Sequence, residues 1–315
     1  MRGERAVPSR VLVTGAGGLI GSAVVSTLAA AGAAVTALDR RPFEHPGAAR
    51  TLVGDAGDPE AVREVLAGPA GVVDAVVHLA AVPHPSLGTP LEVFRTNVVA
   101  TFTVLATAAE LGVRRAVTAS SINASGVPQN AHRPMPAYFP LDEDLPDDIE
   151  DAYSLSKAVD ERTARMVHRR WGTDVVALRF PHVAGTGALR RVAAAARSDP
   201  GATVREGWSW LHVQDAAAAV LAALTHAPGG AHVVGLAAEE TLLDVPTAEA
   251  LARWAPGVPQ RVAPYGRSGL VDTSRARALL GFRPTHSPPS LLDAPGARPE
   301  PIPDRSDRAA HPVVR

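Results

Sequence analysis

The chain has no cysteine among its 315 residues, which excludes disulfide bonds, thiolate metal sites and a cysteine nucleophile. Its net charge of −1 at pH 7 provides neither the basic surface of a nucleic-acid-binding protein nor a polyacidic one. No long apolar run follows the charged segment 1–10, so we predict neither a signal peptide nor a membrane span. We therefore expect a cytoplasmic protein without a nucleic-acid, membrane or metal partner, whose ligand is a small molecule.

Lysine is almost as scarce, because Lys157 is the only one and every other strongly basic side chain is arginine. A lysine is required where an ammonium must act as a compact point charge, change its pKa or pass a proton. Tyr153 lies four residues earlier, so on a helix the two side chains share one face. An adjacent ammonium lowers a phenol pKa from its usual value of about 10, which makes the pair a proton donor and acceptor near neutral pH. A simple surface contact has the same spacing, so other parts of the chain must decide between the two.

A glycine-rich turn near the N-terminus indicates dinucleotide binding. The β-rich run 11–14 leads into Gly15, Gly18 and Gly21, and an alanine-rich helical pattern follows to about residue 31. In this context the glycines permit a tight turn, a close approach to a pyrophosphate and close packing of helix on strand. The helix N-terminus then faces the anion.

Acidic residues after the next two strands refine this prediction. Asp39 ends the strand at 34–39, about twenty positions beyond the glycine turn, where it accepts hydrogen bonds from the adenosine ribose. A carboxylate repels a 2′-phosphate, so NAD is favoured over NADP, although Arg40 and Arg41 could receive that phosphate. Asp58 is expected to cap a helix that begins with a proline, and Asp55 either reaches the adenine or holds the turn.

The order of the remaining elements predicts an α/β fold, a doubly wound Rossmann sheet with a smaller C-terminal substrate-binding lobe. Strands are expected at 51–53, 74–81, 114–121 and 173–180, and long helices at 91–111 and 152–170. His78 is expected to be a buried, hydrogen-bonded residue. The irregular stretch 122–150 is long for a loop and should cover a site. We expect an NAD-binding domain at 8–180 with its sheet completed by later segments, the lobe mainly at 181–283, and a proline-rich disordered tail at 284–315.

Together these motifs resemble the extended short-chain dehydrogenase/reductase family, also called the NAD-dependent epimerase/dehydratase family, over about residues 10–283. The resemblance rests on the sequence segments Thr14-Gly15-x-x-Gly18-x-x-Gly21, Asp39, Gly54-Asp55-x-x-Asp58, His78-Leu79-Ala80-Ala81, Asn97-Val98-x-x-Thr101, Ser120-Ser121 and Tyr153-x-x-x-Lys157, with weaker support from Leu178-Arg179-Phe180 and Trp210-Leu211-His212-Val213-Gln214-Asp215.

The resemblance implies a role for each matching residue. Tyr153 is the catalytic acid/base, Lys157 lowers its pKa and holds the nicotinamide ribose, and Asn97 supports the lysine. Ser121, or Ser120 in a register shifted by one, hydrogen-bonds the reacting oxygen. The expected cofactor-binding residues are Gly15, Gly18, Leu19, Ile20, Gly21, Asp39, Arg40, Asp55, Ala56, Leu79, Ala80, Ala81, Asn97, Tyr153, Lys157 and Phe180. The expected substrate contacts are His84, Ser121, Asn123, Tyr138 and His182. The family also implies a homodimer built from the helices at 91–111 and 152–170.

Departures from the family pattern weaken a nucleotide-sugar assignment. Pro181-His182 stands where such enzymes often have an asparagine, and Ser125 replaces the usual tyrosine. No motif identifies the arginines that would bind a diphosphate, and the candidates are Arg190, Arg191 and Arg205. We therefore predict an NAD(P)-dependent oxidoreductase that acts on a secondary alcohol or ketone of a sugar, uronic acid or polar natural-product intermediate. The alternatives are a nucleotide-sugar epimerase or dehydratase that oxidises its substrate transiently, and a non-catalytic NAD(P)-binding regulatory protein.

Overall fold

The computed structural model describes residues 6–288 of the chain. Its centre is a seven-stranded sheet in which every neighbouring pair of strands is parallel. The strand order is β3 (Arg50–Val53), β2 (Ala34–Asp39), β1 (Arg10–Thr14), β4 (Ala75–His78), β5 (Arg115–Ser121), β6 (Asp174–Phe180) and β9 (Ala231–Gly235). The predicted doubly wound Rossmann sheet is confirmed, and its last strand comes from the C-terminal half.

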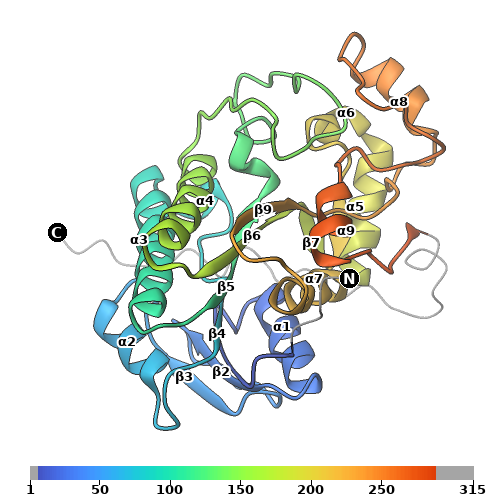
Figure 1. Cartoon of the computed structure of the whole chain (residues 1–315). Coiled ribbons are helices and arrows are strands. Elements are labelled where there is room, and N and C mark those ends of the chain that lie inside the picture. The colour runs from blue at the N-terminus through green and yellow to red at the C-terminus, as the bar shows by residue number, and fades with distance from the viewer. Residues whose placement is uncertain (1–5, 289–315) are drawn as a thin grey trace.

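Helices cover both faces of the sheet (Figure 1). On one face pack α2 (Pro59–Ala67), α3 (Pro90–Glu110) and α4 (Ala152–Trp171), and on the other α1 (Leu19–Ala30), α7 (Val213–Thr225) and α9 (Ser274–Leu280). Within β1, Val11 and Val13 pack into one core and Leu12 into the other, because successive side chains of a strand point to opposite faces. Burial on both faces explains why this strand is an unbroken apolar run.

Three helices of the first half, α2, α3 and α4, begin at recognisable capping residues. Asp58 accepts hydrogen bonds from the backbone N–H groups of residues 60 and 61 at the start of α2, as expected. Thr89 and Glu92 form a capping box at α3, and Asp151 caps α4. Gly172, in the left-handed region, ends α4. Local sequence therefore sets these boundaries.

A smaller lobe lies beyond the carboxyl ends of the strands. It contains α5 (Thr186–Ser198), α6 (Pro200–Thr203), α8 (Thr247–Trp254) and a two-stranded parallel sheet of β7 (His182–Ala184) and β8 (Trp210–His212). The irregular stretch 122–150 joins this lobe, because Phe139 and Leu141 form β-bridges with Gln260 and Val271. The lobe and the sheet therefore enclose space above the strand ends.

The predicted tail from 284 begins with residues that are packed against the sheet layer. The backbone N–H and the hydroxyl of Thr285 donate to Asp215 Oδ1 at 3.0 and 2.7 Å, and the His286 N–H donates to Asp215 Oδ2 at 3.1 Å. The imidazole of His286 also stacks on that of His212, with ring centroids 3.7 Å apart. The rest of the predicted tail, 289–315, lies outside the described residues.

Candidate active site

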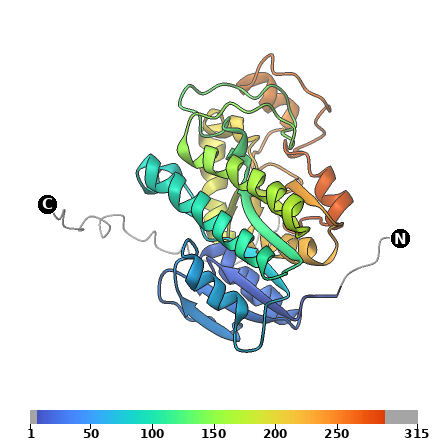
Figure 2. The same ribbon diagram turned by 60° about the vertical axis from the view of Figure 1, so that its left-hand side comes forward.

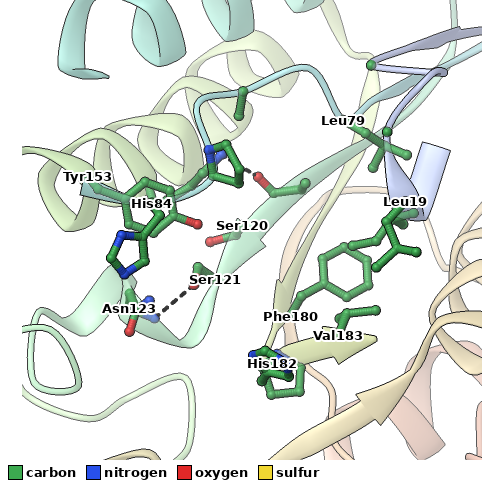
Figure 3. A pocket seen from close by; sticks show the side chains of 18 of the residues that line it. Leu19, Leu79, His84, Ser120, Ser121, Asn123, Tyr153, Phe180, His182 and Val183 are labelled. Carbon is green, nitrogen blue, oxygen red and sulfur yellow. Dashed lines mark hydrogen bonds between the residues drawn. The ribbon is translucent and has the colours of Figure 1, made fainter. Parts of the chain in front are cut away.

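A cavity of about 840 Å³ lies at the carboxyl ends of the central strands, at the point where the chain reverses its winding between β1 and β4. That position and size are typical of ligand sites in open α/β sheets, which measure roughly 300–1,000 Å³. Figure 3 shows Tyr153, His84, Ser121 and Asn123 on one side of the cavity, and Phe180, His182 and Val183 on the other.

The cavity brings together most of the predicted site residues. Its lining includes Gly15, Gly18, Leu19, Ile20, Gly21, Asp39, Arg40, Asp55, Ala56, Leu79, Ala80, Ala81, His84, Ser121, Asn123, Tyr153, Lys157, Phe180 and His182. Asn97 and Tyr138 do not line it.

The glycine turn between β1 and α1 is closed too tightly for side chains. A Cβ on Gly21 would lie 2.0 Å from the carbonyl oxygen of Gly15, and a Cβ on Gly15 would lie 2.6 Å from the Ala80 nitrogen. Helix α1 starts here with no acid in its first turn and, unlike α2, α3 and α4, with no side-chain cap. Its free N–H groups and the positive end of its dipole therefore suit the pyrophosphate of a dinucleotide.

Asp39 lies at the end of β2 beside this turn. Its Oδ2 accepts a hydrogen bond from the Gly17 N–H and its Oδ1 from the Arg41 N–H, both at 3.1 Å. The two bonds hold the carboxylate at the cavity wall, where ribose hydroxyls of NAD would be its partners. Arg40 lines the cavity and Arg41 does not. This arrangement fits NAD.

Lys157 is buried on α4, and its ammonium is held by two oxygen atoms. It donates to the Ala119 carbonyl and to Asp160 Oδ2, both at 3.0 Å. Burial lowers the pKa of Lys157, but the negative charges of Asp160, Tyr153 and Glu161 together outweigh burial and raise that pKa overall. The lysine therefore stays charged beside the Tyr153 phenol, which packs against Val82 and Val93 and lines the cavity.

The two serines at the end of β5 have different partners. The Ser120 hydroxyl donates to Glu161 Oε1 at 2.6 Å, and Glu161 also binds the Arg179 guanidinium at 2.8 and 2.9 Å. The Ser121 oxygen instead accepts from the Asn123 N–H at 3.1 Å, which leaves its own proton free to be donated toward the cavity. Ser120 thus belongs to a buried structural network.

Asn97 is fully buried on α3 and braces the loop after β4. Its Oδ1 accepts from the Val82 N–H at 2.7 Å, and its Nδ2 donates to the Val82 carbonyl at 3.1 Å and to Ser156 Oγ at 3.0 Å. Among the described residues no hydrogen bond joins Asn97 to Lys157, and its link to α4 is the Ser156 side chain. Its bonds to Val82 position the segment that carries Pro83 and His84 at the cavity.

The contacts of Tyr138 are those of a structural residue. The Tyr138 hydroxyl donates to Asp142 Oδ1 at 2.6 Å, and the Arg261 guanidinium carbon lies 3.3 Å from its ring centroid. This side chain packs in the core of the smaller lobe and not at the cavity.

His78 is buried as expected, between the hydroxyls of Thr14 and Thr101, and burial together with the Lys157 charge lowers its pKa to about 3.

Further lining residues come from the smaller lobe and were absent from our sequence-based prediction. They are Gln129, Val192, Ala196, Thr203, Glu206, Trp208, Ser209, Trp210 and Leu242. Most lie in irregular or short elements without a motif. One signal was available, because two of the four tryptophans fall at positions 208 and 210, and Trp210 is the first residue of the segment 210–215 that the resemblance includes.

Known proteins resemble this chain in sequence and in fold. The sequence profile of the NAD dependent epimerase/dehydratase family matches residues 11–235. A UDP-glucose 4-epimerase from Azospirillum brasilense is 31% identical over 59% of this chain, but the match spans only about half of that relative, 52%. A 3-diazoavenalumate denitrifying reductase from a Streptomyces species is 32% identical over 91% of this chain and 99% of that protein.

The fold is shared with a solved short-chain dehydrogenase/reductase superfamily protein from Agrobacterium tumefaciens that contains bound NAD. The two are 25% identical, the match covers 90% of this chain and 95% of that one, and the TM-score is 0.68. With a family match over most of the chain and a cavity suited to the dinucleotide, this protein is an NAD-dependent enzyme that belongs to the NAD dependent epimerase/dehydratase family.

Proposed function

We propose that the enzyme catalyses net oxidation of a secondary alcohol or reduction of the corresponding ketone. The observation that carries this proposal is the joint position of Tyr153, Lys157 and Ser121 at the middle of one cavity whose other end suits NAD. Bound NAD supplies the hydride chemistry. In the reductive direction the Tyr153 phenol gives its proton to the carbonyl oxygen, and the Ser121 hydroxyl donates a hydrogen bond to the same oxygen.

Lys157 supports this proton transfer electrostatically. Its buried ammonium favours the phenolate that Tyr153 becomes after giving up its proton. Ser120 also lines the cavity, but its hydroxyl proton is already donated to Glu161, which favours Ser121 for the role at the reacting oxygen. In the oxidative direction the same groups act in reverse, with Tyr153 accepting the hydroxyl proton of the substrate.

A spectroscopic assay tests the proposal. Purified enzyme with NAD or NADH is offered a panel of secondary alcohols and ketones, and the near-ultraviolet absorbance of NADH is followed. We expect a substrate-dependent gain or loss of NADH that continues over many turnovers. Turnover with no net absorbance change and with tightly retained NAD would contradict the proposal.

That outcome would favour the runner-up, an epimerase in which the hydride returns to the substrate. The similarity to UDP-glucose 4-epimerase supports this second reading. The match to a reductase along 99% of its length supports the first. A non-catalytic regulatory role has no observation in its favour.

We further propose a homodimer formed through α3 and α4, which lie side by side on the surface (Figure 2). Large apolar side chains on the two helices are exposed, namely Leu91 at 72%, Val99 at 43%, Phe102 at 49% and Leu155 at 44%. Their spacing on α3 places residues 91, 99 and 102 on one face of the helix. Burying such a face against a second copy removes it from water.

Substitution of Phe102 by glutamate tests the dimer. We expect wild-type protein at twice the 32.6 kDa chain mass and Phe102→Glu at the mass of one chain, because a charge cannot be buried in the interface. Light scattering coupled to size exclusion measures both. Tyr265→Glu, at a side chain that is 90% exposed in the smaller lobe, is the matched control and should remain dimeric.

A further inference from the structure

The substrate end of the cavity is formed largely by one short segment, residues 203–210. This segment contributes Thr203, Glu206, Trp208, Ser209 and Trp210 to the lining. It runs through a short 3₁₀ turn at Val204–Glu206 and then into β8. Its side chains, more than any motif of the cofactor end, determine which molecule fits beside the nicotinamide.

Glu206 places an unpaired carboxylate at this end. Among the described residues, none donates a hydrogen bond to it or forms an ion pair with it. The neighbouring Arg205 turns away and donates to the carbonyls of Val127 and Asn130, at 3.1 and 2.9 Å. Burial raises the pKa of Glu206 by more than the Arg205 charge lowers it. A desolvated carboxyl without a partner is costly, so a ligand group is its natural partner.

Three neighbouring side chains share this property. Thr203 Oγ1, Ser209 Oγ and Asn123 Oδ1 are buried, and none has a hydrogen-bond partner among the described residues. All three residues line the cavity. Each of these three oxygens has almost no accessible surface, so a ligand in the cavity cannot contact them directly. Glu206 is only partly buried and lines the cavity, so its carboxylate is the unpaired polar group that a ligand at this end can reach.

The remaining wall is apolar and aromatic. The indole N–H of Trp208 donates to the Pro200 carbonyl at 2.8 Å, and that of Trp210 donates to the Glu240 carbonyl at 2.7 Å. Both polar atoms of these rings are therefore satisfied away from the ligand. Val192, Ala196 and Leu242 add aliphatic surface to the same lining. Such walls suit a flat, apolar molecule.

Cations line only the cofactor half of the cavity. Among the described lining residues the sole arginine is Arg40, beside the glycine turn, and the sole lysine is the buried Lys157. The three arginines named as diphosphate candidates, Arg190, Arg191 and Arg205, are not in the lining. A nucleoside diphosphate placed at the substrate end would therefore bring its negative charges to Glu206 without a compensating cation.

We infer that the substrate is a planar, largely apolar alcohol or ketone that carries an amine or hydroxyl group, which donates a hydrogen bond to Glu206, and that nucleoside diphosphates are excluded. This inference rests on the proposed alcohol–ketone chemistry at Tyr153. It adds a specificity residue, Glu206, that no family motif contains.

Binding to the NADH-loaded enzyme by calorimetry provides the test, with three matched ketone probes and one nucleotide. The probes are acetophenone, 4-aminoacetophenone, 4-hydroxyacetophenone and UDP. We expect the two ketones with a donor group to bind more tightly than acetophenone by roughly ten-fold or more, since hydrogen bonds to charged groups are the strong ones. UDP should bind more weakly than all three.

The Glu206→Gln variant should abolish most of the difference between acetophenone and its donor-bearing analogues. Glu249→Gln, at an exposed glutamate of α8 in the same lobe, should leave the difference intact. Tighter binding of UDP than of the ketones, equal binding of the three ketones to wild-type enzyme, or no ketone binding would each overturn the inference.

The assay also separates this inference from the proposed function. If UDP-glucose, and no ketone, is turned over in a reaction that requires Tyr153, the proposed hydride chemistry is supported and the inferred substrate class, a planar apolar alcohol or ketone, is wrong. If the ketones bind with the expected order but no NADH is consumed or formed with any alcohol or ketone, the substrate class stands and the proposed net redox reaction falls.

Discussion

In the proposed mechanism the ammonium of Lys157 and the phenol of Tyr153 act as a proton-transfer pair, and buried neighbours keep the lysine charged. The Ala119 carbonyl and the Asp160 carboxylate each accept a hydrogen bond from the ammonium at 3.0 Å. The third N–H of the ammonium is left for a ligand such as a ribose hydroxyl. At the scale of single residues, the proposed reaction therefore depends on the protonation states of Tyr153 and Lys157.

Removal of the Tyr153 hydroxyl should stop proton transfer and spare the cofactor. We expect Tyr153→Phe to lower kcat on the order of a hundred- to ten-thousand-fold, the usual contribution of a general acid or base. NADH affinity, followed by fluorescence titration, should stay close to wild type. Full activity in this variant would show that another group moves the proton.

Asp160 is expected to act as a positioning residue for Lys157. Because burial lowers the lysine pKa and Asp160 is the foremost charge opposing it, Asp160→Asn should lower that pKa. The high-pH limb of kcat/KM should then move to lower pH by about one unit or more. Asp148→Asn, at an exposed aspartate, is the control. An unchanged pH profile in Asp160→Asn would rule out this role.

The sequence reveals some of these residues and hides others for a physical reason. Lys157 is conspicuous because it is the only lysine, and Tyr153 follows from helical spacing. Asp160 is one turn further along the same helix and looks like any surface acid until its burial is known. Glu206 lies in an irregular segment, where no periodicity indicates which way a side chain points.

At the scale of elements, the glycine turn between β1 and α1 is the segment where we expect substitutions to be tolerated least. A side chain on residue 21 would meet the backbone of residue 15, and one on residue 15 would meet the backbone after β4 at residues 79 and 80, so a side chain at residue 21 would have to move the helix. That movement would displace the N–H groups that face the cavity.

A single methyl group tests this constraint. Gly21→Ala places its Cβ 2.0 Å from the Gly15 carbonyl oxygen. We therefore expect the affinity for NADH to fall at least ten-fold, which corresponds to about 1.4 kcal/mol or more of binding free energy. Gly187→Ala, whose Cβ meets nothing within 4 Å, should bind NADH normally. Normal NADH binding by Gly21→Ala would show that the turn is more adaptable than its packing indicates.

Elements of the first half follow closely from the sequence, because each contains its own boundary signals. The helix expected at 91–111 is α3, Pro90–Glu110, and the capping aspartate expected at 58 is present. The contacts of Tyr138 were beyond prediction, because they join it to Arg261, more than a hundred residues away. Long-range contacts of this kind have no local sequence pattern.

For the whole molecule, Asp215 links the start of α7 to the segment that follows α9. Burial would raise its pKa, but hydrogen bonds from Thr285 and His286 lower it below the usual value. Asp215 thus contributes stability that is present above the pKa of an unfolded aspartate, about 4, and is lost as pH falls below it.

We expect Asp215→Asn to reduce the free energy of unfolding by about 1.5–3 kcal/mol at neutral pH, as for hydrogen bonds to a charged group. The deficit should shrink as pH falls below about 4, the unfolded value, and disappear once pH is below the lowered pKa of the folded carboxylate. Urea denaturation at both pH values measures the effect. Asp244→Asn, whose partner Arg197 forms a surface pair, should change little. A deficit that persists at low pH would mean that the carboxylate charge is not its source.

The chain passes repeatedly between the sheet and the smaller lobe: it leaves after β5, returns for α4 and β6, leaves again for α5, and returns for α7 and β9 (Figure 1). No single cut can therefore separate a cofactor module from a substrate module. A third excursion between β9 and α9, residues 236–273, contributes α8 to the lobe and Leu242 to the cavity lining. Substrate preference can therefore be varied by exchanging the three excursions, 122–150, 181–212 and 236–273, while the strands that bracket them keep the cofactor half intact. Grafting all three excursions together between relatives is the exchange that this topology permits.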